Sequence, residues 1–437
     1  MEKTGLAHTL HEKIKNRTVR AGVIGLGYVG LPLAVEFAKG GVTVTGIDLD
    51  TKKIRAIEAG NSYIQDVPQD VVRDLVKAKK ISATDDFSVI SALDTINICV
   101  PTPLRKSKDP DMSYIVAAAE QIARYLHPGM LIVLESTTYP GTTEEVILPM
   151  LEEKGFKVGK DFFLAFSPER VDPGNPVYHT RNIPKVVGGV TPECTRLAAE
   201  FYKIAVEKVH LVSGTRSAEM VKLLENTFRS VNIGLVNEMC QMSEKLGVNI
   251  WEIIEAAATK PFGFMPFYPG PGLGGHCIPI DPHYLAWKAK SHGFNPRFIE
   301  LADAVNSNMP EFVVRKAQDT LNRFSKPLRG TRVHVLGVTY KKNVSDFRES
   351  PAFHIIEMLE KDGALVTYTD PYVPELKTAG ASYRSVDLEA QPVKADLAIL
   401  VTDHDWFDRK ALLEKFSLIL DTRNFFKGTA SGQIVRL

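Results

Sequence analysis

Short runs of β-branched and other apolar residues alternate with longer helical stretches between Val19 and about residue 210. The runs are RAGVIGLG, VTVTGID, DTINICVPTP, MLIVLEST, FFLAFSPE and KVVGG. Strands that alternate with helices are typical of right-handed βαβ units, in which helices cover a parallel sheet. The same rhythm returns from Arg332 in RVHVLGVTY, ALVTYTDP, ADLAILVT and LILDTRN. The pattern therefore predicts an α/β protein with two doubly wound domains.

The middle of the chain has a helical pattern instead. In SAEMVKLLENTFRSVNIGLVNEMCQMSEKLGV, apolar residues from Met220 to Met239 recur at helical spacing, and Gly247 supplies a stop. A Pro- and Gly-rich loop, 261–282, interrupts this section before HYLAWKAKSHG resumes the helical pattern. SKPLRGT, 325–331, is the expected linker. We expect an N-terminal domain over 1–210, a central helical domain with one long helix over 211–324, and a C-terminal domain over 325–437.

Composition excludes several classes of protein. The 437 residues are enough for about three domains at roughly 150 residues each. The chain has 53 Lys and Arg against 52 Asp and Glu, a net charge of +1, so no basic surface for nucleic acid or an anionic membrane is expected. No apolar run approaches the ~18 residues of a membrane span. The N-terminus is polar, unlike a signal peptide, and its Leu6, Leu10 and Ile14 predict a short amphipathic helix. We expect a cytoplasmic protein.

Four cysteines, Cys99, Cys194, Cys240 and Cys277, stand far apart in the sequence. They form neither the spacing of a metal site nor a disulfide framework, and no metal is expected. Lone cysteines are usually small buried hydrophobes, and we predict this for the first three.

VIGLGYVGLPLA contains a predicted dinucleotide site. Gly25, Gly27 and Gly30 form a G-x-G-x-x-G pattern that follows one strand and opens a helix, and Asp48 ends the next strand. We expect a tight turn at Gly25, backbone approach to a pyrophosphate at Gly27, and close helix packing at Gly30. The carboxylate of Asp48 would accept from a ribose 2′-hydroxyl and repel a 2′-phosphate, which favours NAD over NADP. The first domain is therefore expected to be a Rossmann domain.

Further polar residues are candidates at the same edge of this sheet. Tyr28 and Val29 lie inside the glycine turn, and Thr102 and Thr138 follow two later strands. Ligands of open α/β sheets bind at the carboxyl ends of strands, so these residues are candidate cofactor contacts.

The last α/β section lacks the dinucleotide pattern. VHVLGVTYKKN has one glycine, Gly337, followed by Lys341 and Lys342. A Rossmann-like domain with lysines at this turn suits another phosphate-bearing ligand. A solvated lysine pair explains the same residues equally well.

PGPGLGGHCIPIDP, 269–282, places Cys277 in a segment too rich in glycine for core structure. A thiol is nucleophilic only as thiolate, and nearby donors or positive charge favour that form. The backbone of Gly275, His276 and Cys277 would offer exposed N–H groups, and the glycines would let a substrate approach closely. A dehydrogenase with a nucleophilic cysteine can oxidise an aldehyde through a thiohemiacetal to a thioester. The role of His276 stays open between lowering the thiol pKa, orientation and substrate contact.

Over residues 18–430 the chain resembles the UDP-glucose/GDP-mannose dehydrogenase family. The motifs are GLGYVGLPLA, ESTTYPGTTEE, FSPERVDPGN, EMVKLLENTFRSVNIGLVNE, GPGLGGHCIPIDP, GVTYKKNVSDFRESP and DTRN. The resemblance implies an NAD-binding domain, a central dimerisation domain and a C-terminal nucleotide-sugar domain. PFGFMPFYPGPGLGGHCIPIDPHYL is most similar to the bacterial UDP-N-acetylhexosamine 6-dehydrogenases of surface-polysaccharide pathways. That similarity implies four-electron oxidation of C6, with UDP-GlcNAc as the expected substrate and a homo-oligomer as the expected assembly.

The resemblance also implies roles for individual residues. Cys277 matches the nucleophile that carries the thiohemiacetal and the thioester. Lys222 and Asn226, which share one helix face, would donate to the oxygen that becomes an alkoxide or oxyanion. Glu169 matches the carboxylate that activates water for thioester hydrolysis.

Other positions match binding stretches of the family. Asp281 and Thr138 would position water and complete the polar site. The NAD contacts implied by the resemblance are Lys53, Thr102, Thr138 and Arg348. The substrate contacts it implies are Glu169, Lys222, Asn226, Tyr268, Gly272, Lys341 and Arg423.

Several alternatives fit part of the sequence. UDP-glucose, UDP-GalNAc or UDP-ManNAc are alternative substrates. A two-electron β-hydroxyacid dehydrogenase would share the Rossmann domain and the lysine–asparagine pair, but it needs neither Cys277 nor a second α/β domain. A non-enzymatic NAD-sensing protein would have no use for Cys277, Glu169 and Asp281 together.

Overall fold

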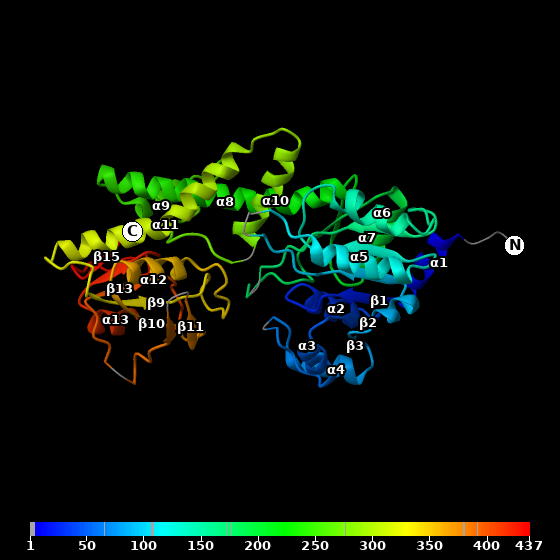
Figure 1. Ribbon diagram of the computed structural model, residues 1–437, viewed down its shortest axis with the longest axis horizontal. Helices are drawn as coiled ribbons and strands as arrows, with labels where there is room; N and C mark the ends of the chain where they lie inside the picture. The colour runs from blue at the N-terminus through cyan, green and yellow to red at the C-terminus, as the bar shows by residue number, and fades with distance from the viewer. Residues whose placement is uncertain are drawn as a thin grey trace. The chain divides into compact units, whose positions relative to one another are not determined.

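The computed structural model describes residues 5–437 apart from 65, 106–108, 173, 176, 276, 379–380 and 391. The chain forms two compact units (Figure 1). The first consists of Met1–Glu225 and His283–Gly293, and the second of Asn226–Pro282 and Phe294–Leu437. The chain passes from one unit to the other within α8 (Thr215–Leu246) and α10 (Cys277–Ser291). The expected division at 210 and 324 remains a prediction.

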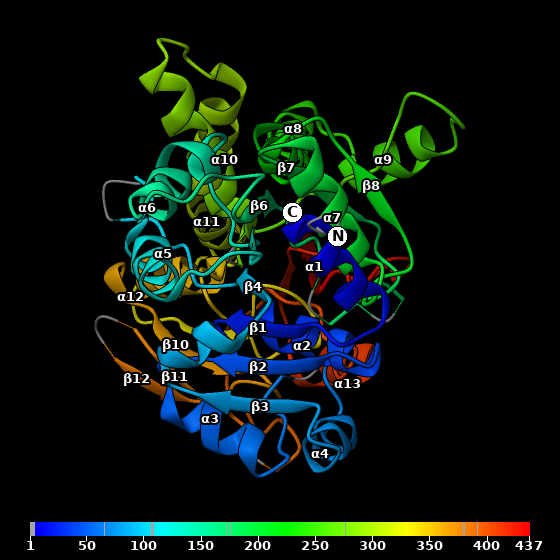
Figure 2. The same cartoon turned by 90° about the vertical axis from the view of Figure 1, so that its right-hand side faces the viewer.

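The first unit contains an eight-stranded sheet. Its order is β3-β2-β1-β4-β5-β6-β7-β8, and Figure 2 shows β4, β1, β2 and β3 side by side. Neighbouring strands run parallel except for β6 and β7, which pair antiparallel. The strands are β1 (Arg20–Ile24), β2 (Thr43–Ile47), β3 (Ile81–Thr84), β4 (Thr95–Ile98), β5 (Leu131–Leu134), β6 (Phe163–Phe166), β7 (Lys185–Gly189) and β8 (Val209–Leu211).

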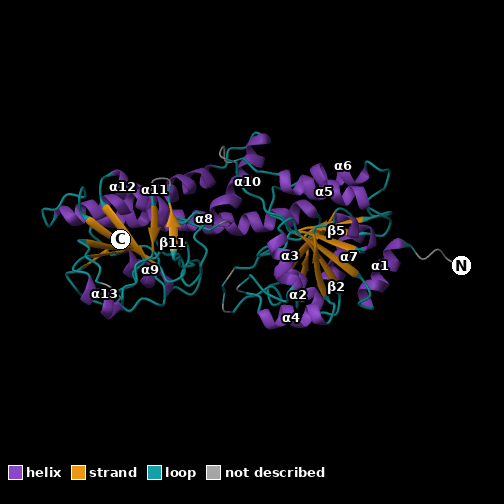
Figure 3. Cartoon of the chain, turned by 60° about the horizontal axis from the view of Figure 1, so that its bottom comes forward, coloured by secondary structure: helices purple, strands orange, loops and turns teal. Residues whose placement is uncertain are grey.

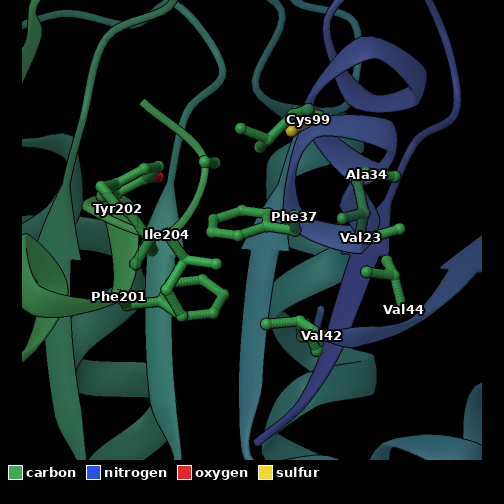
Figure 4. Close-up of a cluster of buried hydrophobic side chains, with 14 of the residues drawn as sticks. Val23, Ala34, Phe37, Val42, Val44, Cys99, Phe201, Tyr202 and Ile204 are labelled. Atoms are coloured by element: carbon green, nitrogen blue, oxygen red, sulfur yellow. The ribbon is translucent and has the colours of Figure 1, made fainter. Parts of the chain in front are cut away.

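Helices cover both faces of this sheet (Figure 3). Successive strand residues face opposite sides, so Val23 joins one apolar core and Ile24 the other. On the first face, the rings of Phe37 and Phe201 stack with centroids 4.1 Å apart (Figure 4). The helices are α1 (Leu6–Lys15), α2 (Gly30–Lys39), α3 (Thr51–Glu58), α4 (Gln69–Lys77), η1 (Phe87–Ala92), α5 (Ser113–Tyr125), η2 (Thr143–Ile147), α6 (Leu148–Glu152) and α7 (Pro192–Tyr202).

The second unit combines helices with a five-stranded parallel sheet of order β10-β9-β13-β14-β15. Residues of α8, α9 and α11 share an apolar core with one face of this sheet and with α12, and α13 packs on the other face. The helices are α9 (Ile250–Ala258), α11 (Arg297–Asn322), α12 (Pro351–Lys361) and α13 (Arg409–Lys415). The strands are β9 (Arg332–Leu336), β10 (Leu365–Thr369), β13 (Leu397–Leu400), β14 (Ile419–Asp421), β15 (Ile434–Arg436) and the separate antiparallel pair β11 (Glu375–Lys377) and β12 (Ser382–Arg384).

Most of the predicted elements are confirmed. The two α/β sections, the amphipathic helix α1 and the single long helix α8 are present, and α8 ends one residue before Gly247, whose φ is 69°. Cys99, Cys194 and Cys240 are buried, as predicted, whereas Cys277 is exposed. Among the described residues, none of the helices combines the length and the apolar character that a membrane crossing requires.

The predicted loop 261–282 is wrong at its C-terminal end, because α10 already begins at Cys277. Proline is compatible with the first helical turn, where backbone N–H groups have no helical partner, and Pro279 falls there. Pro282 lies inside the helix, so the prolines that indicated a loop belong to a helix instead.

Candidate active site

The turn between β1 and α2 carries the three glycines of the predicted dinucleotide site. Gly25 has a φ of 92°, and a Cβ there would lie 2.5 Å from the carbonyl oxygen of Cys99. A Cβ on Gly30 would overlap the carbonyl oxygen of Gly25, whereas one on Gly27 would meet no atom of the described residues within 4 Å. Gly25 and Gly30 thus allow close packing, and Gly27 leaves open backbone where α2 begins. This arrangement fits a bound pyrophosphate.

Asp48 directly follows β2 and lies beside the glycine turn. One of its carboxylate oxygens accepts from Leu26 N at 2.8 Å and from Lys53 Nζ at 3.0 Å. The other oxygen accepts from Asp50 N at 2.9 Å. A carboxylate has about four acceptor sites, so it retains capacity for a ribose hydroxyl. Tyr28, inside the turn, is about half exposed, and Val29 precedes the first residue of α2.

The loops after β4 and β5 carry Thr102 and Thr138. Both side chains are buried, and a bond of 2.8 Å from Ser136 Oγ to Val100 O joins the two loops. Because β1, β4 and β5 are parallel, these loops lie at the edge of the sheet that carries the glycine turn. Arg348, also predicted to contact NAD, belongs to the second unit, where its guanidinium pairs with Asp346 at 2.6 Å.

The N-terminal half of α8 is bonded to the segment that follows β5. Lys222 Nζ donates to Thr137 Oγ1 at 2.7 Å. One turn earlier, the buried carboxylate of Glu219 accepts from Gly141 N at 2.5 Å and from Thr143 N at 2.9 Å. These bonds hold Lys222 close to the loop that contains Thr138.

Glu169 is buried in the loop after β6. One carboxylate oxygen accepts from the backbone N–H groups of Arg170 and Val171, at 2.6 and 2.8 Å. The other accepts from Lys185 Nζ at 3.1 Å. Burial alone would raise the pKa of Glu169. The charge of Lys185 and the hydrogen bond from Val171 N lower it by more than burial raises it, so the pKa lies below its usual value. Glu169 is therefore ionised at neutral pH.

Cys277 is exposed and is the first residue of α10. A helix N-terminus favours negative charge, as a thiolate requires. The expectation of exposed N–H groups is wrong for Gly275, whose N–H donates to Arg348 O at 3.1 Å. His276 lies outside the described residues.

Asp281 stands four residues after Cys277 on α10, so the two residues share one helix face. Asn226 Nδ2 donates to Asp281 Oδ2 at 2.6 Å. The second unit therefore brings Asn226 of α8 into contact with Asp281 of α10, the helix that starts with Cys277. Both were predicted catalytic residues.

The predicted substrate contacts of the second unit cluster in part. A Cβ on Gly270, which lies between Tyr268 and Gly272, would stand 2.6 Å from the guanidinium of Arg423. Tyr268 is about half exposed, and its ring stacks on Trp251 with centroids 6.2 Å apart. Lys341 lies in the turn after β9, where its carbonyl oxygen accepts from Thr339 Oγ1.

The glycines before Cys277 were expected to let a substrate approach closely, which remains a prediction. The structure shows close packing within the protein at three of them. Cβ atoms on Gly274 and Gly275 would lie 2.6 and 2.8 Å from the side chain of Tyr340. One on Gly272, where φ is 137°, would lie 3.0 Å from Pro351. The protein's own side chains fill this space, so these glycines allow the loop to pack against the segments after β9.

Sequence reasoning missed the buried charges of the first unit. Lys185 Nζ bonds to Glu135 Oε2 at 2.6 Å as well as to Glu169. A charged residue at the end of an otherwise apolar run, as in MLIVLE and KVVGG, was the available signal. Glu219 gave no signal, because a glutamate in an amphipathic helix resembles a surface residue.

Three family models match successive parts of the chain. They are the NAD binding domain (residues 19–206), the central domain (216–308) and the UDP binding domain (334–428) of the UDP-glucose/GDP-mannose dehydrogenase family.

Individual relatives match nearly the whole chain. A UDP-N-acetyl-D-glucosamine 6-dehydrogenase from Pseudomonas aeruginosa is 36% identical over 82% of this chain and 84% of its own. An NDP-N-acetyl-D-galactosaminuronic acid dehydrogenase from Ralstonia nicotianae is 34% identical over 92% and 95%. The solved structure of a UDP-D-ManNAc dehydrogenase from Pyrococcus horikoshii has a TM-score of 0.87 and 33% identity over 96% of this chain and 99% of that one.

Proposed function

Because the chain belongs to the UDP-glucose/GDP-mannose dehydrogenase family, a family of NAD-dependent nucleotide-sugar dehydrogenases, we propose that it oxidises C6 of UDP-GlcNAc to the uronate. The reaction removes four electrons in two steps, and its product serves as a precursor of surface polysaccharide. One observation supports this proposal above the others. Cys277 is exposed and begins α10, and Asp281 lies on the same face of this helix. The side chain of Asp281 accepts a hydrogen bond from Asn226.

The chain's own residues would divide the work as follows. Gly25, Gly27, Gly30 and Asp48 would hold NAD, which would supply the hydride acceptor for both oxidations of C6. The Cys277 thiolate adds to the aldehyde carbon after the first oxidation, and the second leaves a thioester on its sulfur. Lys222 and Asn226 donate to the carbon-bound oxygen while it carries negative charge.

Hydrolysis releases the product. Glu169 accepts a proton from water as the water oxygen bonds to the thioester carbon. The carbon–sulfur bond then breaks, and the Cys277 thiolate and the uronate are the products. Asp281 and Thr138 would orient this water.

The UDP-sugar would contact residues of the UDP-binding domain and of the preceding loop. Tyr268 offers an exposed ring, and Arg423 and Lys341 offer positive charge for a diphosphate. Gly272 shapes the loop between them. Lys53, Thr102 and Arg348 would complete the contacts to NAD. We further propose a homo-oligomer in which α8 packs against a second copy.

The preference for UDP-GlcNAc is supported by the 36% identity with the Pseudomonas aeruginosa enzyme, although relatives named for other N-acetylhexosamines are 34% identical. We expect UDP-GlcNAc to have the highest kcat/KM, UDP-GalNAc the next and UDP-glucose a low value. A panel of these sugars with UDP-ManNAc, followed by NADH absorbance, measures the order. A preference for UDP-glucose would contradict the assignment.

Two variants test the covalent route. Cys277→Ser should bind NAD and substrate but form no uronate, because a serine hydroxyl is not ionised as a thiol is. Glu169→Gln should accumulate a thioester, visible as a mass increase of one nucleotide sugar. The wild-type enzyme should produce two NADH per uronate without free aldehyde. One NADH per turnover, or full uronate formation by Cys277→Ser, would instead favour a two-electron dehydrogenase.

A further inference from the structure

Three buried charged side chains meet at one edge of the first sheet. Glu135 directly follows β5, Glu169 follows β6 after two residues, and Lys185 is the first residue of β7. The antiparallel pairing of β6 and β7 explains how the lysine reaches this edge. Phe166 pairs with Gly188, so the same register continued along both strands sets Glu169 opposite Lys185. In a fully parallel sheet, the start of β7 would lie at the other edge.

Lys185 bonds to both carboxylates. Its Nζ lies 2.6 Å from Glu135 Oε2 and 3.1 Å from Glu169 Oε2, and all three side chains are less than a tenth exposed. Glu135 has other donors, because its second oxygen accepts from Asn97 Nδ2 at 2.7 Å and from Tyr202 OH at 2.6 Å. Glu169 therefore shares the ammonium of Lys185 with Glu135, whose carboxylate also has hydrogen bonds from two other side chains.

The charge balance of this cluster decides the state of Glu169. Burial lowers the pKa of Lys185, but the two carboxylates raise it above its ordinary range, so the lysine stays charged. Burial raises the pKa of Glu169, and Lys185 contributes most to the opposing decrease. Among the described residues, other titratable groups that act on the cluster include Cys99 after β4, Tyr202 on α7 and Lys222 on α8.

We propose that Lys185 is a positioning residue that orients Glu169 and keeps it ionised for thioester hydrolysis, and that Glu135 limits this effect by sharing the ammonium. The inference rests on the proposed role of Glu169 as the base. Lys185 would act through Glu169, because its buried Nζ bonds to Glu135 and Glu169. The cluster holds one cation and two carboxylates. Removing the charge of Lys185 should therefore favour protonation of Glu169, and removing the charge of Glu135 should favour its ionised form.

The test is the pH dependence of thioester breakdown in single-turnover reactions with UDP-GlcNAc and NAD, followed as loss of the adduct mass from Cys277. The rate falls at low pH as Glu169 is protonated. Lys185→Met leaves two buried carboxylates without their cation, so this fall should move to higher pH by about one to three units. Lys185→Arg restores the charge and should return the profile toward that of the wild type.

Glu135→Gln provides a variant with the opposite expectation. Without Glu135, repulsion of Glu169 is lost and Lys185 is attracted to Glu169 alone, so the fall should move to lower pH. A general loss of packing would shift both variants in the same direction, and that result would overturn the inference. Unchanged profiles in all three variants would also overturn it, because the N–H groups of Arg170 and Val171 would then suffice. If Lys185→Met does not fold, the shift of the Glu135→Gln profile to lower pH still decides the question, with Lys185→Arg as the control that keeps the charge.

The Glu169→Gln variant distinguishes a failure of the proposed base from a failure of the inference about Lys185. If its adduct breaks down at the wild-type rate, the proposed base is wrong. If its adduct accumulates while the profiles of the Lys185 and Glu135 variants match that of the wild type, only the inference about Lys185 fails.

Discussion

Glu219 is a buried carboxylate on α8, three residues before Lys222, and it accepts hydrogen bonds from the backbone at Gly141 and Thr143. Burial raises its pKa to about 7 despite these bonds. The same residue that fixes the loop of Thr138 to α8 therefore titrates near neutral pH. A carboxylate with a folded-state pKa above its unfolded value takes up a proton on folding, which favours the folded state at lower pH.

Stability should follow this titration. Between about pH 4.5 and about pH 7, the contribution of Glu219 to the free energy of unfolding falls as pH rises, and above that range it is constant. Glu219→Gln carries no charge, so its free energy of unfolding relative to wild type should increase through the same window, by about 3 kcal/mol at 1.4 kcal/mol per pKa unit. Urea denaturation at a series of pH values measures the difference, with Glu238→Gln on the exposed side of α8 as control. Parallel curves for Glu219→Gln and wild type would contradict the assignment.

Elements with a strong periodic pattern of apolar residues could be predicted from the sequence. Elements whose conformation depends on tertiary contacts with distant residues could not. α8 and most strands of the two sheets followed from the apolar runs and their spacing, whereas β3, β8 and β15 correspond to no predicted run. The tight turn at Gly25 and the close packing at Gly30 were also as expected. The start of α10 was missed because its prolines indicate a loop when tertiary packing is unknown. The packing of the glycines near Cys277 was not predicted because Tyr340, which fills the space beside two of them, is distant in sequence. The contact between Lys185 and Glu169 was missed because it depends on the antiparallel pairing of β6 and β7, which no local sequence pattern indicates.

The packing of the glycine loop gives a prediction with a matched control. Gly275 and Gly263 both have positive φ, 81° and 70°, but a Cβ on Gly275 meets the ring of Tyr340 at 2.8 Å, and one on Gly263 meets no atom of the described residues within 4 Å. Alanine at either position costs about 1 to 2 kcal/mol of backbone strain. Gly275→Ala should cost about 1 to 3 kcal/mol more than Gly263→Ala in urea denaturation.

The excess should disappear in the Tyr340→Ala background, because the overlapping ring is then absent. An equal cost for both glycine variants in the wild-type background would show that the loop moves away from Tyr340 without penalty.

For the whole molecule, the exposed side of α8 bears on assembly. Phe228, Leu235 and Met242 recur every seven residues and are each about half exposed. An apolar stripe of this kind on a long helix is typical of an interface. This supports the proposed homo-oligomer, since a symmetric pair of helices would bury each residue twice.

Leu235→Glu should therefore shift the protein toward monomer in sedimentation analysis, because a charge replaces an apolar side chain worth about 1.5 to 3 kcal/mol when buried in each copy. Leu49→Glu, at an exposed leucine of the first unit, is the matched control and should leave the mass unchanged. A monomeric wild-type protein, or equal behaviour of the two variants, would contradict the proposal.

Residues 283–293 belong to the first unit, although residues 226–282 of the second unit precede them in the chain. Within the first unit, Trp287 packs on Tyr139 with ring centroids 5.0 Å apart, and Lys288 pairs with Glu145 at 2.6 Å. A ribosome adds about 5 to 20 residues per second, so these partners emerge on the order of several seconds after Glu225. The nucleotide-binding sheet can begin to fold during synthesis, but it acquires its last helical segment only after part of its neighbour has been translated.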